Sequence, residues 1–384
     1  MPTIKWAFLF FIIFVSLFNQ ITRAYKSVYL NKNNNDILNV DYIIVGCGLA
    51  GIHFCEKLKE NNKSFVVFDD KSQTSSLVAG GLYNPVVLKR FTSVWKSTEQ
   101  IQLALPIYNK IEKECGVILD HKTPVYRRFT SVEEQNNWFV AADKPELSTY
   151  LSSEIIKNEN PAIEAPFGFG KVLETGRIDT QLLIESYKKS LLSNQQLVEE
   201  SFNYDSLQIS DTLQYKYIRA KHIVFAEGFG IIQNLFFNHL PLKEAKGELL
   251  VIHAPDLKID YVLKSSVFLI PLGKDLYTVG ATYNWKDKTN AITQQAREEL
   301  LNKLKTFLKC DFEVVDQVAG IRPTVSDRRP LVGKHTSHKN MFVLNGLGTR
   351  GVMIAPYIAK QLYEFIELSL PLEEEINIER FIKY

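Results

Sequence analysis

A glycine-rich turn near the start of the chain has the residue types and spacing that hold a pyrophosphate. Residues 46–51 read GCGLAG, a G-x-G-x-x-G, and follow a mostly β-branched run at 40–45. The first glycine of this pattern allows a tight turn, the second lets the backbone approach the phosphates, and the third lets helix and strand pack closely. N–H groups at the start of the following helix then attract the anion. The residues predicted to bind are Gly46, Gly48, Leu49, Ala50 and Gly51.

The turn belongs to a strand–turn–helix–strand unit of about thirty residues, as the dinucleotide fingerprint requires. Apolar residues recur at helical spacing in 52–58, and residues 65–68 read as a second buried strand. Asp69, with its neighbour Asp70, follows eighteen residues after Gly51, where an acid accepts hydrogen bonds from ribose hydroxyls. An acid there disfavours a 2′-phosphate and fits either NAD or FAD.

Composition narrows the class of protein. The chain has 384 residues, 46% hydrophobic and 23% charged, which is typical of a globular protein with two domains. The net charge of +2 argues against a dedicated nucleic-acid binder. The four cysteines form no CxxC pair and the seven histidines show no metal-binding spacing, so neither a disulfide scaffold nor a metal site is expected.

The N-terminus begins with an apolar segment. Residues 6–18 form a nearly unbroken apolar run behind Lys5, shorter than the roughly 20 residues that span a bilayer. The run resembles a signal-peptide core with a cleavage site at 22–24. The alternative is an upstream extension that is not part of the functional protein. We expect 1–37 to be a signal-like or anchor segment and linker, with membrane contact only through 4–21. The body of the protein is expected to be cytoplasmic, because no twin-arginine pair is present.

Further along the chain lie three more segments with small residues. Residues 75–85 contain hydroxyls and glycines, against which a flat ligand could lie, and residues 223–230 read as a buried strand that ends in small residues. Near the C-terminus, Gly-Ile-Arg-Pro at 320–323 precedes a strand at 341–344, a glycine-rich turn, and a helix at about 355–368.

In this order the segments resemble the FAD-dependent amine oxidoreductases of the D-amino acid oxidase superfamily, particularly glycine oxidase, sarcosine oxidase and D-amino acid dehydrogenase. The resemblance covers about residues 40–370 and rests on both the N-terminal fingerprint and the C-terminal Arg-Pro and glycine block. It implies FAD as cofactor and an α/β fold (α+β overall). A Rossmann-like FAD-binding domain with a parallel sheet would accompany a substrate domain with a mixed or antiparallel sheet.

The resemblance also implies that both domains are discontinuous in sequence. The FAD-binding domain would take 38–105, 175–242 and 312–384, and the substrate domain 106–174 and 243–311. Within these limits, Asp179 is expected to cap one helix, and an amphipathic helix is expected at 298–308.

Cofactor-binding roles carry over residue by residue. Gly46, Gly48 and Gly51 match the pyrophosphate glycines and Asp69 the ribose acid. Glu227 stands where relatives usually have threonine, which puts a side-chain contact there in doubt. The turn at 348–351 matches the one whose N–H groups point at the flavin N1–C2=O edge. The remaining matches are Ser75, Ser76, Ala79, Gly80 and Gly81 along the pyrophosphate, ribityl chain and flavin edge, Ala226 and Gly228 at a strand end, and Gly348, Thr349, Arg350 and Gly351.

Two arginines are the catalytic candidates. Arg322 matches the arginine that binds the substrate carboxylate in amino-acid oxidases, where a bidentate guanidinium orients the Cα–H toward flavin N5; the alternative is a surface salt bridge. Arg90 lies where sarcosine-oxidase-like enzymes place a second basic residue, although Lys89 and Arg90 could equally be solvated. Phe268 replaces a tyrosine frequent in glycine oxidase, which weakens the case for glycine as substrate.

The resulting hypothesis is an enzyme that oxidises the C–N bond of an amino acid or related amine by hydride transfer to flavin N5. Its electron acceptor would be O2 or a quinone or carrier, and no nucleic-acid partner is expected. Alternatives are a flavoprotein or nucleotide-binding protein without turnover, an NAD-dependent enzyme, and the FAD module of a tRNA-uridine-modifying enzyme. The last is disfavoured because this chain lacks a methyltransferase half and is not basic.

Overall fold

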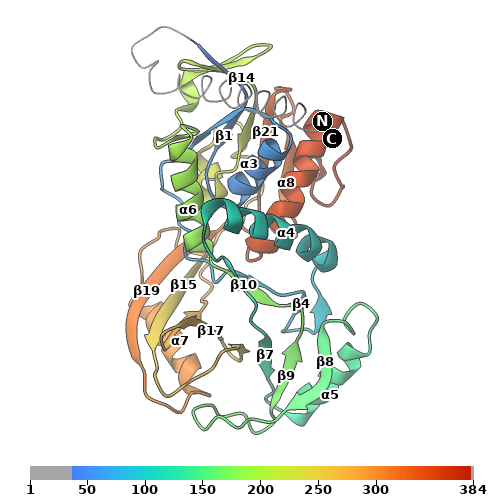
Figure 1. The fold of residues 1–384 in the computed structure, drawn as a ribbon, viewed down its shortest axis with the longest axis vertical. Coiled ribbons are helices and arrows are strands. Elements are labelled where there is room, and N and C mark those ends of the chain that lie inside the picture. The colour runs from blue at the N-terminus through green and yellow to red at the C-terminus, as the bar shows by residue number, and fades with distance from the viewer. Residues whose placement is uncertain (1–36, 382–384) are drawn as a thin grey trace, which may run out of the picture.

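The first of two large sheets is built around buried parallel strands (Figure 1). The computed structural model describes residues 37–381. Ile43 and Ile44 of the central strand are fully buried, as both faces of a parallel sheet require. In spatial order its strands are β11 (Leu197–Val198), β2 (Phe65–Phe68), β1 (Leu38–Val45), β14 (Ile218–Phe225), β13 (Leu213–Tyr215) and β12 (Leu207–Ile209), with β21 (Met341–Asn345) between β14 and β20 (Leu331–Lys334).

Helices cover one face of this sheet. Ile44 of β1, Ile52 of α3 and Ile358 of α8 belong to one apolar core, whereas Ile43 faces a second core with Phe225. Asp179 caps α6 as expected, since its carboxylate accepts a hydrogen bond from Leu182 N at 3.1 Å. The helices are α3 (Leu49–Glu60), α4 (Ser97–Cys115), α6 (Thr180–Ser193) and α8 (Gly351–Leu368).

The second sheet lies at the other end of the long axis, and α4 crosses between the two (Figure 1). It is antiparallel except where β16 pairs with β7. One face packs on α7 (Gln294–Lys305). Its strands are β19 (Glu313–Arg322), β15 (Ala245–His253), β18 (Leu276–Gly280), β17 (Phe268–Gly273), β16 (Val262–Lys264), β7 (Val125–Arg128), β9 (Phe169–Val172) and β8 (Leu151–Ile156).

Short elements complete the described fold. The helix α5 (Val132–Ala142) packs on β8, and its N-cap Ser131 accepts a hydrogen bond from Glu134 N. The others are β3 (Leu82–Tyr83), β4 (Val86–Val87), β5 (Thr92–Ser93), β6 (Asp120–His121), β10 (Gly176–Ile178), η1 (Tyr204–Ser206), η2 (Gly228–Gln233) and η3 (Ile378–Phe381).

The architecture confirms the predicted fold class, an α/β protein with one mainly parallel and one mainly antiparallel sheet. The helix expected at 298–308 begins earlier, as α7, because the Thr293 hydroxyl accepts a hydrogen bond from Ala296 N at 3.2 Å. The division into domains stays a prediction. However, β19 pairs along its length with β15, so the second sheet extends past the boundary drawn at residue 312.

The apolar run at 6–18 and the rest of segment 1–36 lie outside the described residues, so the signal or anchor hypothesis stays a prediction. Within 37–381, none of the helices combines the length and apolar character needed to cross a bilayer.

Candidate cofactor and substrate site

A cavity of about 690 Å³ runs from the carboxyl ends of β1, β2, β14 and β21 to one face of the second sheet. This is where open α/β sheets bind ligands, because their parallel strands end at one edge. The predicted site residues line this cavity, except Gly51 and Arg90. Segments more than 250 residues apart in sequence, such as Gly46 and Arg322, thus contribute to one continuous space.

The three fingerprint glycines have different surroundings. Gly46 has φ +101°, and a Cβ there would lie 2.5 Å from the carbonyl oxygen of Ala226. A Cβ on Gly51 would lie 2.0 Å from the Gly46 carbonyl oxygen, so this residue permits close packing and does not face the cavity. On Gly48, the added atom would meet only the Ser76 side chain, with its hydroxyl at 3.2 Å. Gly48 alone of the three leaves space on the cavity side.

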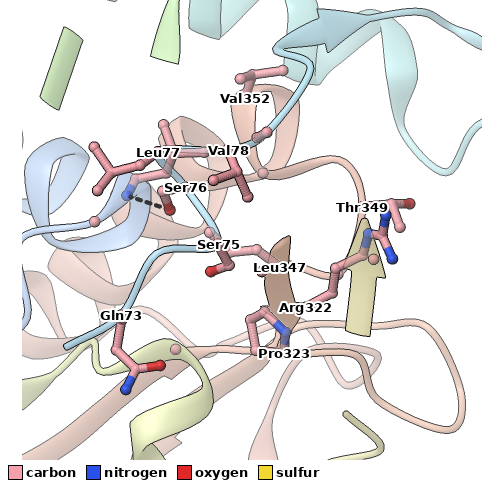
Figure 2. Close-up of a pocket in the computed structure, with 18 of the residues that line it drawn as sticks. Gln73, Ser75, Ser76, Leu77, Val78, Arg322, Pro323, Leu347, Thr349 and Val352 are labelled. Carbon is pink, nitrogen blue, oxygen red and sulfur yellow. Dashed lines mark hydrogen bonds between the residues drawn. The ribbon is translucent and has the colours of Figure 1, made fainter. Parts of the chain in front are cut away.

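Two helices begin at the cavity without a side-chain cap. The N-cap of α3 is Gly48, and Leu49 N–H has only a long contact of 3.4 Å to the Ser76 hydroxyl (Figure 2). The N-cap of α8 is Arg350, which follows Gly348 and Thr349 in the turn after β21. Uncapped N–H groups and the positive end of a helix stabilise anions. The two helix starts therefore suit a phosphate and an anionic ring edge.

Asp69 is already held by protein donors. Its carboxylate accepts hydrogen bonds from Cys47 N at 2.8 Å and from Lys188 Nζ at 2.5 Å. Lys188 comes from α6 and also lines the cavity. Asp70 instead accepts a hydrogen bond from the Ser201 hydroxyl at 2.7 Å. Asp69 thus lies beside the glycine turn and is paired with Lys188. No pattern in the sequence near either residue predicts this pairing.

Glu227, the departure from the threonine of relatives, has its own partners. It accepts hydrogen bonds from the Tyr204 hydroxyl and from Asn234 Nδ2, the latter at 2.6 Å. Burial raises the pKa of its carboxyl to about 7. The neighbouring Gly228 carbonyl accepts a hydrogen bond from Asn345 Nδ2 at 2.9 Å, which ties the end of β14 to the end of β21.

Arg322 projects from β19 into the cavity (Figure 2). One guanidinium nitrogen donates to the Thr282 carbonyl at 3.3 Å, and the group lies 4.6 Å from the centre of the Tyr283 ring. Burial lowers the pKa of Arg322 from its ordinary value. None of the salt bridges among residues 37–381 involves this side chain. A desolvated guanidinium without a carboxylate partner is equipped to bind one from a ligand.

Gly247 on β15 makes room for this guanidinium. A Cβ at Gly247 would lie 2.0 Å from the nearest Arg322 nitrogen, so no other residue fits without moving the arginine. The two residues are brought together by the pairing of β15 with β19, in which Gly247 lies opposite Gly320.

Arg90 is not brought into the cavity. It is exposed in the turn between β4 and β5, and its neighbour Lys89 lines the cavity instead. Phe268 does line it, from β17. Sequence reasoning missed Lys264 on β16, a lysine in an apolar strand that also faces the cavity. Within the described residues, no cluster of three potential metal ligands is present.

The described geometry agrees with comparisons to known proteins. The model of a family described as "DAO: FAD dependent oxidoreductase" matches residues 41–365. The chain belongs to this family of FAD-dependent oxidoreductases. Glycine oxidase of Bacillus subtilis (strain 168) is 22% identical over 358 residues, 87% of this chain and 94% of that protein.

Further relatives and solved structures include two other named activities besides glycine oxidase. The tRNA 5-methylaminomethyl-2-thiouridine biosynthesis bifunctional protein MnmC of Legionella pneumophila (strain Lens) is 22% identical, and the match covers 95% of this chain but 62% of that protein. Among solved structures, glycine oxidase from Geobacillus kaustophilus aligns with a TM-score of 0.74 at 18% identity, over 89% of this chain and 98% of that one. Iminodiacetate oxidase from Chelativorans sp. BNC1 aligns with a TM-score of 0.72 at 17% identity, over 88% and 98%.

FAD is the cofactor of this family, which confirms the predicted cofactor. The residues present fit it: the uncapped start of α3 and the open side of Gly48 suit the pyrophosphate, and Asp69 suits the ribose. The N-terminus of α8 suits the electron-rich edge of the flavin ring. These individual contacts stay predictions.

Proposed function

We propose that the protein oxidises the C–N bond of an amino acid or related carboxylated amine. The observation that carries this proposal is Arg322, a largely desolvated guanidinium that faces the cavity and has no acid partner among the described side chains. A buried arginine left unpaired is costly, so an anionic ligand is the natural partner. The names of two relatives support an amine as substrate: glycine oxidase and iminodiacetate oxidase are both named after carboxylated amines.

The chain's own residues would bind and orient the substrate. Arg322 would donate two parallel hydrogen bonds to the carboxylate, and Gly247 would leave room for the guanidinium. The guanidinium also lies over the Tyr283 ring, 4.6 Å from its centre, a cation–π contact. FAD, when bound, supplies the hydride acceptor. Because the flavin carries out the redox chemistry, the protein's contribution is placement and exclusion of water.

The experiment is anaerobic bleaching of the purified protein. We expect a yellow preparation whose absorbance near 450 nm disappears on mixing with at least one amino acid or N-substituted amino acid. Reoxidation by air or by a quinone would then identify the electron acceptor. A yellow protein that no carboxylated amine reduces would refute the proposal and leave a flavoprotein without this turnover.

A second candidate is oxidation of an aminomethyl group carried by tRNA. It is favoured by the MnmC match, which spans nearly the whole chain. The net charge of +2 disfavours it, because proteins that bind RNA usually carry a basic face. Reduction by modified tRNA but not by free amino acids would select this candidate.

A further inference from the structure

One face of the second sheet lines the cavity from edge strand to inner strand. Residues two apart in a strand share a face, and so do directly paired residues of neighbouring strands. Leu249 pairs with Gly280, Gly280 with Phe268, and Phe268 with Lys264, and all four line the cavity. Arg322 lies on the same face, on β19. The sheet therefore presents two cations to one space, Arg322 at one end and Lys264 at the other.

Lys264 has no acid of its own. Its two cationic neighbours are each paired: Arg127 with Glu134, and Lys303 with Glu299, both at 2.5 Å. No salt bridge of Lys264 occurs within 37–381, and its closest charge-stabilising contact is the Phe268 ring, 4.7 Å from Nζ. Burial, with the positive charges of Arg127 and Lys303, lowers the pKa of Lys264 to about 8. A partly buried ammonium beside two other cations lacks the anion that would stabilise it.

The row of residues that runs from Lys264 toward β15 is apolar. Phe268 and Leu249 line the cavity in this row, with Gly280 between them. The strands that carry Arg322 and Lys264 are four strand spacings apart, about 19 Å at about 4.8 Å each. Arg322 also lies four residues along β19 from Val318, the residue that pairs with Leu249 in the row of Lys264. Both side chains are long and shorten this gap. A ligand that reaches both must carry two acidic groups several bonds apart on an apolar linker.

We propose that the substrate is a dianionic amine whose second acidic group binds Lys264, across the cavity from Arg322. This inference rests on the proposed function, since it takes Arg322 to hold the first carboxylate. It makes Lys264 a specificity-determining residue that selects against simple amino acids.

The test uses ligands that cannot be oxidised, so that turnover is not needed. The flavin-loaded protein is titrated with unbranched dicarboxylates from succinate to suberate and with monocarboxylates of equal length, and binding is read from the shift of the flavin absorbance. We expect one dicarboxylate length to bind roughly 10- to 100-fold more tightly than its monocarboxylate, as for a charge-assisted hydrogen bond.

Variants assign this preference to one side chain. Lys264→Met should abolish the dicarboxylate advantage and leave monocarboxylate affinity unchanged, whereas Lys264→Arg should keep most of it. Lys274→Met is the matched control, because Lys274 is exposed in the β17–β18 turn of the same sheet. Equal binding of both ligand series by the parent, or a preference that survives in Lys264→Met, would overturn the inference. If monocarboxylates bind equally well to Arg322→Ala, the proposed function itself fails, whatever Lys264 does.

Discussion

At the scale of single residues, the three fingerprint glycines are not equivalent. Gly46 and Gly51 face backbone atoms, so a side chain on either collides with the fold, whereas Gly48 faces the cavity and a movable hydroxyl. Substitution therefore separates effects on folding from effects on cofactor binding.

Gly48→Val should fold and lose FAD. Its Cβ needs a shift of a few tenths of an ångström by Ser76, but the rest of the side chain fills the space for the pyrophosphate. Gly51→Val should misfold, because its Cβ would lie 2.0 Å from a carbonyl oxygen. Circular dichroism and absorbance near 450 nm distinguish the two. A folded, yellow Gly48→Val protein would contradict the assignment.

The charge of Lys264 should make the preference for dicarboxylates depend on pH. The protonated ammonium binds an anion, so a dicarboxylate preference is complete below its pKa of about 8 and is lost as pH rises through it. Burial, together with the facing cations Arg127 and Lys303, holds this pKa low, and a bound anion raises it.

The measurement is the ratio of monocarboxylate to dicarboxylate dissociation constants from pH 6 to 10. In the parent this ratio should fall with pH, while in Lys264→Arg it should stay flat, since arginine remains charged. If this ratio in the parent does not depend on pH, Lys264 does not bind the second carboxylate.

At the scale of elements, pairing of strands creates the site. The contact of Gly247 with Arg322 exists only because β15 pairs with β19. The contact of Asp69 with Lys188 exists only because α6 lies beside the end of β2. Each of these two contacts places a charged group that lines the cavity.

Gly247→Ala should lower activity in the same direction as Arg322→Ala, although the arginine is still present. The added methyl takes the place of the guanidinium, which must leave its position near Thr282. We expect an unchanged flavin spectrum and a kcat/KM for the best carboxylated amine lower by roughly tenfold or more. Full activity of Gly247→Ala would show that Arg322 need not stay where it lies.

Asp69→Ala should weaken FAD binding by about 1–3 kcal/mol, the value of charge-assisted hydrogen bonds to ribose. The change also frees Lys188 and the Cys47 N–H, so part of the loss comes from the turn itself. Asp70→Ala is the comparison, since that carboxylate binds Ser201. Flavin fluorescence titration gives the dissociation constants of FAD for both variants. Equal values for Asp69→Ala and the parent would mean that another group binds the ribose.

At the scale of the whole molecule, the sequence predicts local units well and long-range partners poorly. The β1–α3–β2 unit follows from spacing and motif, because hydrophobic period and glycine geometry are properties of neighbouring residues. Arg322 was instead a candidate through the family resemblance. Lys188, Gly247 and Lys264 could not be found this way. Their roles depend on which strand or helix lies beside them, and no short pattern encodes that. Arg90 shows the opposite case: its place in the chain suggested the site, and its exposure in the β4–β5 turn agrees with the alternative of a solvated charge.

The central claim is that Arg322 holds a substrate carboxylate, and its most direct test compares Arg322→Ala with the parent on two amines that differ only by that carboxylate. The account predicts an intact flavin spectrum and a kcat/KM for the carboxylated amine lower by about 100-fold, or about 3 kcal/mol. Arg322→Lys should recover little of the lost kcat/KM, because an ammonium cannot donate the two parallel hydrogen bonds of a planar guanidinium. The decarboxylated amine should react equally with parent and variant. Undiminished oxidation of the carboxylated amine by Arg322→Ala would contradict the account.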